Sequence, residues 1–431
     1  MNDPKKIAEH GVSALLKAGA NKAHCRLVRT ERHELNVASG EMSLWRTTFD
    51  DQVLLLAIKD NRKASVTLNK SDPEAISRAA EEVLAMTQGA QPDEANDIAE
   101  NQPPASFSVG QATPDREAMH RLMREHLEDT STRYPKVLLM QAILEFVRQD
   151  SYLVNSNGVD LSARKGVYRF TSVFSAKENE RVSSFNGIQV SLRDLRLPLS
   201  EAGSVDRLYR EISEQVHTRP VPDKFTGDVI IAPDSLEDFL NFLTLSIKDR
   251  ALISGTSVYK NSLNQVIASP LLNLYSRPVS DEIADGYFFT ADGYPAKNST
   301  IVDRGVLLTF LLSLYGSNKV GQKRAVNDGE AYVVGAGATP LEEMVKSVER
   351  GIILVRFSGG NPSDNGDLSG VAKNSYYIEG GEIRYPISET MISCNIADVL
   401  RNIEAVSREQ VNYGTKVFPW VKVSRVTISG K

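Results

Sequence analysis

Histidine and cysteine, the side chains that most often bind zinc, are unevenly distributed along the 431-residue chain. Its two cysteines are Cys25 and Cys394. Its six histidines all precede residue 218: His10, His24, His33, His120, His126 and His217. Zinc sites are built mainly from three or four His and Cys ligands. We therefore expect no zinc site within the C-terminal half; a site that borrows ligands from another domain is the alternative.

Other catalytic patterns are also missing from the sequence. His120 and His126, six residues apart on an expected helix, differ by about 240° around its axis and cannot face one metal. Neither a G-x-S-x-G nucleophile motif nor a G-x-x-x-x-G-K-[ST] phosphate loop occurs. The C-terminal segment offers no histidine that would activate Cys394 or a serine. We predict no catalytic residue, no metal ligand and no cofactor.

A loop rich in Gly, Asn and Asp, Ser358–Gly370, is the main candidate for binding. Its backbone N–H groups could receive a peptide carboxylate or an extended strand. Its side-chain oxygens suit a hard cation, but the spacing lacks the full D-x-[DN]-x-[DN]-G-x₅-E calcium pattern. In the plainer interpretation, which we favour, these residues satisfy their own backbone. The candidate peptide-binding residues are Ser358, Gly359, Gly360, Asn361 and Asp367.

Four acidic residues form a second candidate: Asp281, Glu282, Asp285 and Asp292. Paired carboxylates can perform acid–base chemistry. A solvated turn is the interpretation that we favour for this cluster.

Length and composition restrict the class of protein. A chain of 431 residues predicts two or three domains, and 41% apolar with 24% charged residues is typical of a globular protein. The net charge of −5 argues against a nucleic-acid-binding surface. Neither a signal-peptide pattern nor an apolar run of roughly 20 residues is present, so we expect a cytoplasmic protein without membrane contact. The widely separated cysteines suit a reducing compartment.

The N-terminal region, residues 1–113, is predicted to be an α+β domain. An amphipathic helix over Pro4–Ala20 comes first, and a second helix begins near Pro73 and runs to about Met86. Between them, short alternating runs separated by turns, one of them at Asp50-Asp51, predict an antiparallel meander: His24–Val28, Glu34–Val37, Leu44–Thr48, Val53–Ile58 and Ala64–Leu68. Gln88–Pro114 is rich in Pro, Gln, Ala and Asn and is predicted to be a linker.

The middle region, residues 114–222, has an α/β pattern. It combines helices over Pro114–Asp129 and Ser204–His217 with strands over Val137–Val147 and Val159–Val173. The closely spaced Pro220 and Pro222 mark its end, because such prolines favour an extended connection. The last region, residues 223–431, is predicted to be strand-rich with short helices, such as Ser235–Ser246.

A β-hairpin is predicted around Gly380-Gly381, because this dipeptide supplies the positive φ angles of a tight turn. The expected cross-strand pairs are Ile378 with Ile383 and Tyr376 with Tyr385, all on one buried face.

Four motifs follow one another in the last region. F-S-G-G-N begins at Phe357 and N-G-D-x-S-G begins at Asn365. Y-x-I-E-x-G-E-I-x-x-P-I-x-E begins at Tyr376. N-I-x-D-V-L-x-N-I begins at Asn395, which can cap the helix predicted for this motif. In order and spacing they resemble the C-terminal signature of the TldD/PmbA family, also called modulators of DNA gyrase. The resemblance continues upstream through Asp292–Gly321 and, more loosely, covers most of the chain.

The resemblance implies a metalloprotease-related protein that departs from the catalytic members. Active TldD-type members carry an H-E-x-x-x-H helix, and the matching helix here, Ser235–Ser246, has no histidine. Their metal-binding cysteine lies in a turn that matches Tyr413–Lys416, which has no cysteine. Cys394 stands where relatives usually have glycine and is not assigned this role. The chain is thus similar to the PmbA or TldE branch, whose members lack the zinc motif and pair with the catalytic subunit.

The resemblance therefore predicts a non-catalytic subunit of a TldD/TldE-type metalloprotease complex that acts on unfolded peptides, in proteolysis, peptide maturation or antitoxin turnover. The expected partners are a TldD-like catalytic subunit and an unfolded peptide, in a homo- or heterodimer. An extended peptide could bind by strand addition to a sheet edge. The alternative is a stand-alone peptidase with a relocated active site.

Overall fold

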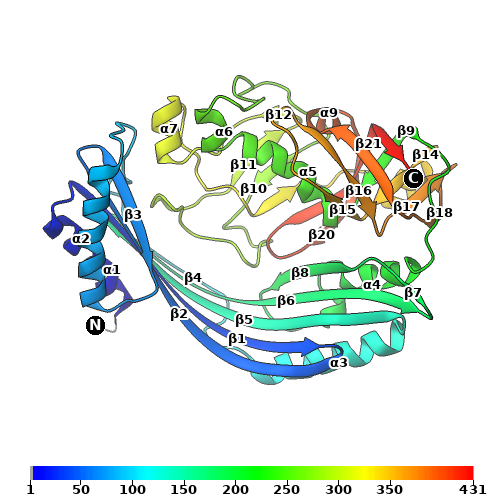
Figure 1. The fold of residues 1–431 in the computed structure, drawn as a ribbon, viewed down its shortest axis with the longest axis horizontal. Helices are drawn as coiled ribbons and strands as arrows, with labels where there is room; N and C mark the ends of the chain where they lie inside the picture. The colour runs from blue at the N-terminus through cyan, green and yellow to red at the C-terminus, as the bar shows by residue number, and fades with distance from the viewer. Residues whose placement is uncertain (1–2, 431) are drawn as a thin grey trace.

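The computed structural model describes residues 3–430, which adopt a mixed α+β fold. Residues 22–192 form an eight-stranded sheet along one side of the molecule, and residues 225–429 form a thirteen-stranded sheet on the other side (Figure 1). This arrangement confirms the predicted class, in which a helix-and-sheet N-terminal region precedes a strand-rich C-terminal region.

Four long antiparallel strands make the body of the N-terminal sheet and curve along their length (Figure 1). They are β1 (Lys22–Ala38), β2 (Glu41–Lys59), β5 (Val137–Asn155) and β6 (Asp160–Glu178), in the spatial order β2-β1-β5-β6. At one border, β3 (Arg62–Leu68) pairs with part of β2. At the other border, three strands pair with β6: β4 (Ala105–Val109), β7 (Arg181–Val182) and β8 (Asn186–Leu192).

Two pairs of helices cover the two ends of this sheet. The helices α1 (Pro4–Ala18) and α2 (Pro73–Gly89) pack around buried residues such as Leu27 and Leu55 at one end. The helices α3 (Arg116–Arg133) and α4 (Val205–Glu214) pack around Tyr168 and Phe170 at the other end. A short 3₁₀ turn, Leu199–Glu201, precedes α4.

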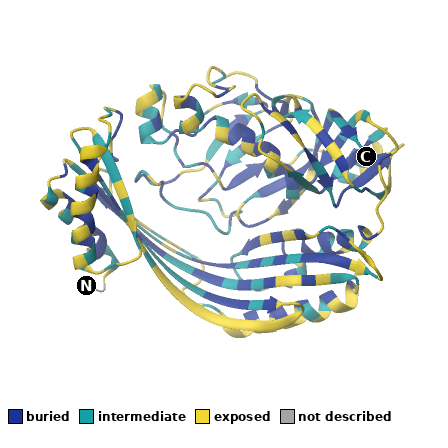
Figure 2. Ribbon diagram, viewed as in Figure 1, coloured by how far each residue is buried: buried dark blue, intermediate teal, exposed yellow. Residues whose placement is uncertain are grey.

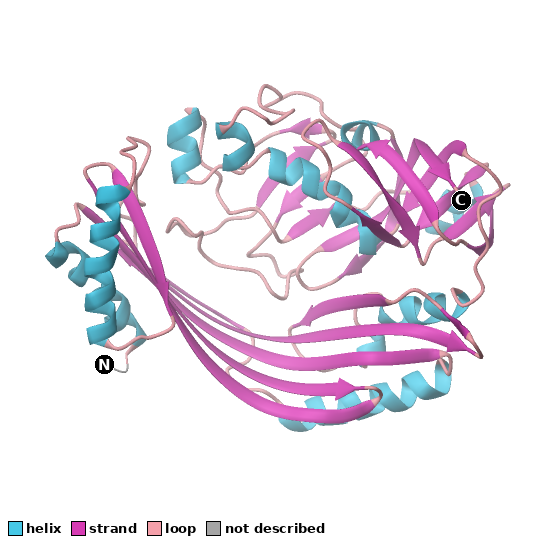
Figure 3. Ribbon diagram, viewed as in Figure 1, coloured by secondary structure: helices cyan, strands magenta, loops and turns pink. Residues whose placement is uncertain are grey.

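Strands dominate the C-terminal part, with short helices around them (Figure 3). Its central strand is β21 (Val417–Ser429), which pairs with β9, β13, β19 and β20. The other strands are β9 (Phe225–Ile231), β10 (Leu274–Ser276), β11 (Ser299–Asp303), β12 (Val306–Leu307), β13 (Tyr332–Val334), β14 (Arg350–Leu354), β15 (Arg356–Gly359), β16 (Asp367–Lys373), β17 (Tyr376–Glu379), β18 (Glu382–Pro386), β19 (Thr390–Asn395) and β20 (Ile403–Asn412). The helices are α5 (Pro233–Ser246), α6 (Asp249–Ile253), α7 (Leu314–Val320), α8 (Leu341–Lys346) and α9 (Ile396–Arg401).

The helix α5 lies in the core of the C-terminal part. It begins with Pro233, whose fixed φ suits the first turn of a helix. Leu236, Phe239, Leu240 and Leu243 recur at helical spacing and are buried against the sheet. At roughly 1.5–3 kcal/mol for each fully buried large apolar side chain, this face holds the helix in place. No helix within residues 3–430 combines the length and apolar character that crossing a membrane requires.

The two parts pack directly against each other. Buried Ile230 of β9 and Tyr209 of α4 belong to the same apolar cluster. At the far end of the sheet, the hydroxyl of Tyr315 donates to Asp93 over 2.8 Å, and the side-chain amide of Gln102 donates to the carbonyl of Gly293 over 2.7 Å. Contacts at both ends thus fix the C-terminal part over the N-terminal sheet.

The structure revises the predicted N-terminal strands. The separate runs expected between His24 and Ile58 are two continuous strands, β1 and β2, and the expected turn at Asp50-Asp51 lies inside β2. The predicted linker contains β4, which pairs in parallel with β6. The expected boundary between residues 113 and 114 falls between strands of one sheet; the three-region division stays a prediction.

The predicted hairpin forms as β17 and β18, with a register shift. Ile378 pairs with Ile383 as expected, but a bulge after Tyr377 places Tyr385 opposite Tyr377, and Tyr376 opposite Pro386. The prediction of a shared buried face is wrong for Ile383, which is 51% exposed. The glycine turn was correctly located, since both Gly380 and Gly381 have positive φ.

Candidate functional site

A pocket of about 240 Å³ lies where the border strand β8 meets the C-terminal part. Its lining comes from three elements: β8, the start of α5, and the turn between β20 and β21. The lining residues are Gly187, Ile188, Gln189, Ser191, Asp234, Tyr413, Thr415 and Lys416. Backbone edge, carboxylate and ammonium groups therefore surround one cavity.

The outer edge of β8 presents unpaired backbone groups to this pocket. Ser191 N–H points away from β6, because it donates to the carbonyl of Tyr413 over 2.8 Å. N–H and C=O groups alternate in direction along a strand, so those of Gln189 also point outward. Neither group of Gln189 has a hydrogen-bond partner within residues 3–430. Ile188 and Val190 meanwhile fix the strand, since their side chains are buried.

Both ends of this edge are attached to the C-terminal part. At one end, Arg356 donates to the carbonyl of Phe185 over 2.6 Å, and Asn374 donates to the same oxygen over 3.1 Å. At the other end, Gly414 has a φ of +76°, and a Cβ there would lie 1.9 Å from the carbonyl oxygen of Ser191. Only glycine allows the turn to approach the strand this closely. The open stretch between these attachments is short and held in position.

Asp234, at the start of α5, is the centre of a buried polar network below the pocket. Its carboxylate accepts hydrogen bonds from Ser204 at 2.8 Å and Tyr413 at 2.9 Å, and it forms an ion pair with Arg207. Arg207 also binds Glu211, 2.9 Å away. Burial raises the pKa of Glu211 to about 7, although Arg207 opposes the shift. Burial and the nearby Asp234 charge raise the pKa of Tyr413 well above its usual value, so its hydroxyl remains a donor.

A second charged cluster supports the turn from the other side. Asp285 binds Lys165 at 2.5 Å and Arg169 at 2.8 Å, both from β6, and accepts a hydrogen bond from Ser191. Its backbone N–H donates to Gly414 over 2.9 Å. Burial tends to raise the pKa of Asp285, but the charges of Lys165 and Arg169 outweigh it and lower the pKa to about 2. Asp285 therefore links three elements: its carboxylate contacts β6 and β8, and its backbone N–H contacts the β20–β21 turn.

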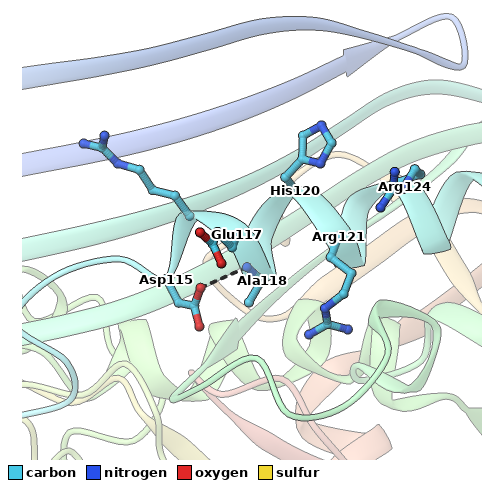
Figure 4. A pocket seen from close by; sticks show the side chains of 7 residues that line it. Asp115, Glu117, Ala118, His120, Arg121 and Arg124 are labelled. Carbon is cyan, nitrogen blue, oxygen red and sulfur yellow. Dashed lines mark hydrogen bonds between the residues drawn. The ribbon is translucent and has the colours of Figure 1, made fainter.

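A larger hollow beside α3, of about 550 Å³, is less suited to binding (Figure 4). Asp115 is used as the helix cap, since it accepts from the Ala118 N–H at 2.9 Å. The side chains of His120 and Arg121 point in different directions (Figure 4). His126, further along α3, is buried and bonded to the hydroxyl of Tyr209, and burial lowers its pKa to about 4. These two histidines do not converge, as their spacing predicts.

Comparison with known proteins identifies the relatives of this chain. Residues 224–430 match the PmbA/TldA metallopeptidase C-terminal domain. The metalloprotease PmbA of Escherichia coli O157:H7 is 23% identical, over 97% of this chain and 96% of the relative. The crystal structure of TldE from Thermococcus kodakarensis superposes with a TM-score of 0.84 at 18% identity, over 98% of this chain and all of the other. A zinc metalloprotease TldD homolog of Saccharolobus solfataricus is 25% identical over 42% of this chain and 44% of its own length.

Residues 224–430 thus carry a PmbA/TldA metallopeptidase C-terminal domain, and the chain is similar to PmbA over nearly its whole length. Zinc is the metal named for the TldD homolog among these relatives, but the residues here do not fit a zinc site. The inner face of α5 carries apolar core side chains, and residues 3–430 contain no group of three His, Cys, Asp or Glu side chains placed to hold a metal. Burial raises the pKa of Cys394 to about 11 and that of Cys25 to about 12, so both thiols stay protonated. We derive no metal chemistry from this chain.

The loop residues proposed from sequence lie outside the β8 pocket. Ser358 and Gly359 are in β15, and Gly360, Asn361 and Asp367 follow around the hairpin to β16. The Asp367 carboxylate accepts from Asn365 and from Asn395, each at 3.0 Å. Their binding role stays a prediction. The base of this hairpin, Arg356, nevertheless holds one end of the open β8 edge.

The acidic cluster is dispersed in the structure. Asp281 is fully exposed, whereas the side chain of Asp285 is only 6% exposed, so the solvated-turn interpretation is wrong for Asp285. Asp292 accepts from the Leu314 N–H at 2.7 Å.

Sequence analysis missed the β8 edge altogether. The available signal was the alternation of Ile188 and Val190 with Gly187 and Gln189, which marks a strand but does not reveal that it is a border strand.

Replacing Gly414 with alanine is expected to separate the turn from β8. The new methyl group would meet the Ser191 carbonyl, and alanine disfavours positive φ. We expect the free energy of unfolding to fall by about 2 kcal/mol in urea titrations followed by circular dichroism. Gly89→Ala is the matched control, since nothing lies within 4 Å of its added Cβ. Equal stabilities of the two variants would contradict the close approach.

Asp285→Asn is expected to change the acid sensitivity of the protein. The folded-state pKa of about 2 lies below the ordinary 3.8, so the unfolded state binds the proton more tightly. The stabilisation from Asp285 is therefore present above about pH 4 and is lost as the pH falls towards 2. The variant should be less stable by about 3 kcal/mol at neutral pH, because Lys165 and Arg169 lose their partner. Its stability should also fall less steeply between pH 4 and 2 than that of the exposed-site control Asp281→Asn.

Proposed function

We propose that this chain is the non-catalytic, peptide-holding subunit of a TldD/TldE-type metalloprotease complex. In this proposal an unfolded peptide adds as a short strand to the outer edge of β8, and a TldD-like subunit carries out hydrolysis. The observation that carries the proposal is the open Gln189 edge inside a pocket, held at both ends by the C-terminal part.

The chemistry of the pocket suits a peptide backbone. Gln189 offers one donor and one acceptor, which together match the backbone groups of one residue in an antiparallel strand. Lys416 and Asp234 add one charge of each sign to the lining. Lys416 is paired with Glu237 and Asp234 with Arg207, so both side chains keep fixed positions. The pocket can therefore pair with a peptide backbone whatever side chain the peptide carries, and binding of varied unfolded peptides requires this.

The assignment of hydrolysis to another subunit rests on the side chains of this one. The α5 face buried in the core is apolar, and the β20–β21 turn carries Gly414, Thr415 and Lys416. The apolar face positions α5, and the turn residues position the turn against β8. Zinc, which would supply an activated water, would belong to the partner. The names PmbA, TldE and TldD among the relatives support a role within such a complex.

Gln189→Pro is expected to weaken peptide binding by about tenfold or more, because proline removes the outward N–H. Proline is tolerated on a border strand when its N–H faces away from the sheet, so the fold should persist. Gln189→Ala keeps the backbone donor and is the matched control. Fluorescence anisotropy with a labelled, unfolded casein-derived peptide measures the affinity, and circular dichroism monitors folding. Equal affinities for both variants would count against the β8 site.

Mixing the chain with a TldD-like subunit tests the role in the complex. We expect the two chains to co-elute in gel filtration and to cleave casein-derived peptides faster than the TldD-like subunit alone. The Gln189→Pro variant should still co-elute but should stimulate cleavage less. Cleavage by the isolated chain, or a TldD-like subunit that is equally active without it and forms no complex, would refute the proposal.

A further inference from the structure

The groups around the β8 pocket carry more negative than positive charge. Asp234 lines the pocket and binds Arg207, but Arg207 also binds Glu211, 2.9 Å away. The side chains of these three residues are at most 17% exposed, so two carboxylates and one guanidinium share a site with little access to water. On the rim, the charge of Lys416 is balanced by its ion pair with Glu237. With both buried carboxylates ionised, one negative charge therefore has no partner. Figure 2 shows this part of the molecule between β8 and the C-terminal part.

Asp238 adds a second unmatched carboxylate, one helical turn beyond Asp234 on α5. Residues four apart on a helix lie on the same side, so both carboxylates belong to the side that borders the pocket. Asp238 is exposed and has no hydrogen-bond or ion-pair partner within residues 3–430. Loss of hydration and the charge of Glu237 raise the pKa of Asp238 to about 6, against the attraction of Lys416. Because Lys416 lines the pocket, this attraction places Asp238 beside it.

We propose that the β8 pocket selects peptides that place an ammonium group, from a lysine side chain or a free amino terminus, against these carboxylates. The inference rests on the proposed function, because it takes the peptide backbone to pair with Gln189. Asp234 keeps one acceptor position for the ammonium group: Oδ1 accepts from Ser204 and Tyr413, whereas Oδ2 binds only Arg207. A lysine reaches this position from the strand edge, because its long apolar stem carries the charge at the tip.

Protons neutralise part of this charge while the pocket is empty. Burial raises the pKa of Glu211 to about 7, against the attraction of Arg207, and the pKa of Asp238 is about 6. A bound ammonium group stabilises the ionised carboxylates, lowers both pKa values and releases protons. The affinity for a lysine peptide therefore rises as the pH increases through these two pKa values, whereas the affinity for an uncharged peptide does not.

The groups that face Glu211 come from its own helix and from three neighbouring elements. They are Arg207, Arg210 and Glu214 of α4, Asp234 of α5, Tyr413 of the β20–β21 turn and Tyr376 of β17. Arginine stays charged at all relevant pH values. Burial raises the pKa of both tyrosines above the ordinary value, so they stay neutral near pH 7. Glu211 and Asp238 therefore supply the expected pH dependence.

Unfolded peptides that differ at one position test the proposal. An N-acetylated peptide with lysine is compared with its norleucine analogue, which has the same stem without the charge. Lysine stays charged throughout, since its ordinary pKa is about 10.4. We expect it to bind roughly tenfold more tightly at about pH 8 and roughly threefold at about pH 5.5. Calorimetry in two buffers of different ionisation enthalpy should detect proton release for the lysine peptide alone. The norleucine peptide with a free amino terminus, measured at about pH 7, shows which source of ammonium the pocket takes.

Two variants locate the charge that is responsible. Asp238→Asn removes an exposed carboxylate without a partner, so the fold should persist while the advantage of lysine falls by roughly threefold. Glu211→Gln still accepts a hydrogen bond from Arg207 but does not titrate, so it should flatten the pH dependence. Glu82→Gln, at an exposed site on α2, is the control and should change neither property. Circular dichroism monitors folding.

The outcomes separate this inference from the proposed function. Equal affinities of the wild-type chain for the lysine peptide and for both norleucine peptides would overturn the charge preference alone, provided that Gln189→Pro still weakens binding. An unchanged lysine advantage in both Asp238→Asn and Glu211→Gln would also overturn it. Absence of binding by any peptide, or binding that Gln189→Pro leaves unchanged, would overturn the proposed function together with this inference.

Discussion

The contact between the β20–β21 turn and the border strand β8 joins the N-terminal sheet to the C-terminal part of the molecule. At this point Ser191 donates to Tyr413, and Gly414 lies so close to the strand that a side chain would not fit. The buried carboxylate of Asp285 binds β6 and β8, and the backbone N–H of the same residue binds the turn. Desolvating such charges is costly, and the cost is offset only while all partners keep their geometry. This contact therefore fixes the turn against β8 and determines which backbone groups on the outer edge of β8 remain unpaired.

Hydrogen bonds and an ion pair around Asp234 hold the helix α5 in this chain, whose residues 224–430 match a metallopeptidase domain, without zinc ligands. In this chain α5 is anchored by its apolar face and by Asp234, which receives bonds from Ser204, Tyr413 and Arg207. Because α4 supplies Arg207 and the β20–β21 turn supplies Tyr413, this network crosslinks the middle of the chain to its C-terminal part. A metal would be one way to join a helix and a turn; here an ion pair and hydrogen bonds do so. The position of the helix relative to β8 is thus independent of any bound ion.

Local features of the sequence predicted the fold better than non-local ones. Helix starts at Pro73 and Asn395, and the Gly380-Gly381 turn, depend on residues within a few positions, and they were located correctly. Asp50-Asp51 resembled a turn, but Asp51 binds Arg29 of β1 and Ser71, which lies between β3 and α2, and the strand continues through it. Asp285 appeared solvated because its partners, Lys165 and Arg169, lie more than 100 residues away in sequence. Whether a strand is a border strand is also decided by tertiary packing, which is why the β8 site could not be predicted.

The two borders of the N-terminal sheet differ in how far other parts of the structure cover them. At β8 the C-terminal part covers both ends of the edge and leaves the backbone groups of Gln189 open in a pocket. Such a short, walled edge excludes another sheet but admits a flexible chain. At β2 no such wall is present among residues 3–430, and the open segment is long, regular and apolar. A rigid strand of equal length gains more there than a flexible peptide does, because it has less conformational entropy to lose. The two edges of one sheet therefore differ in length and enclosure: the open part of β8 is short and walled, whereas that of β2 is long and uncovered.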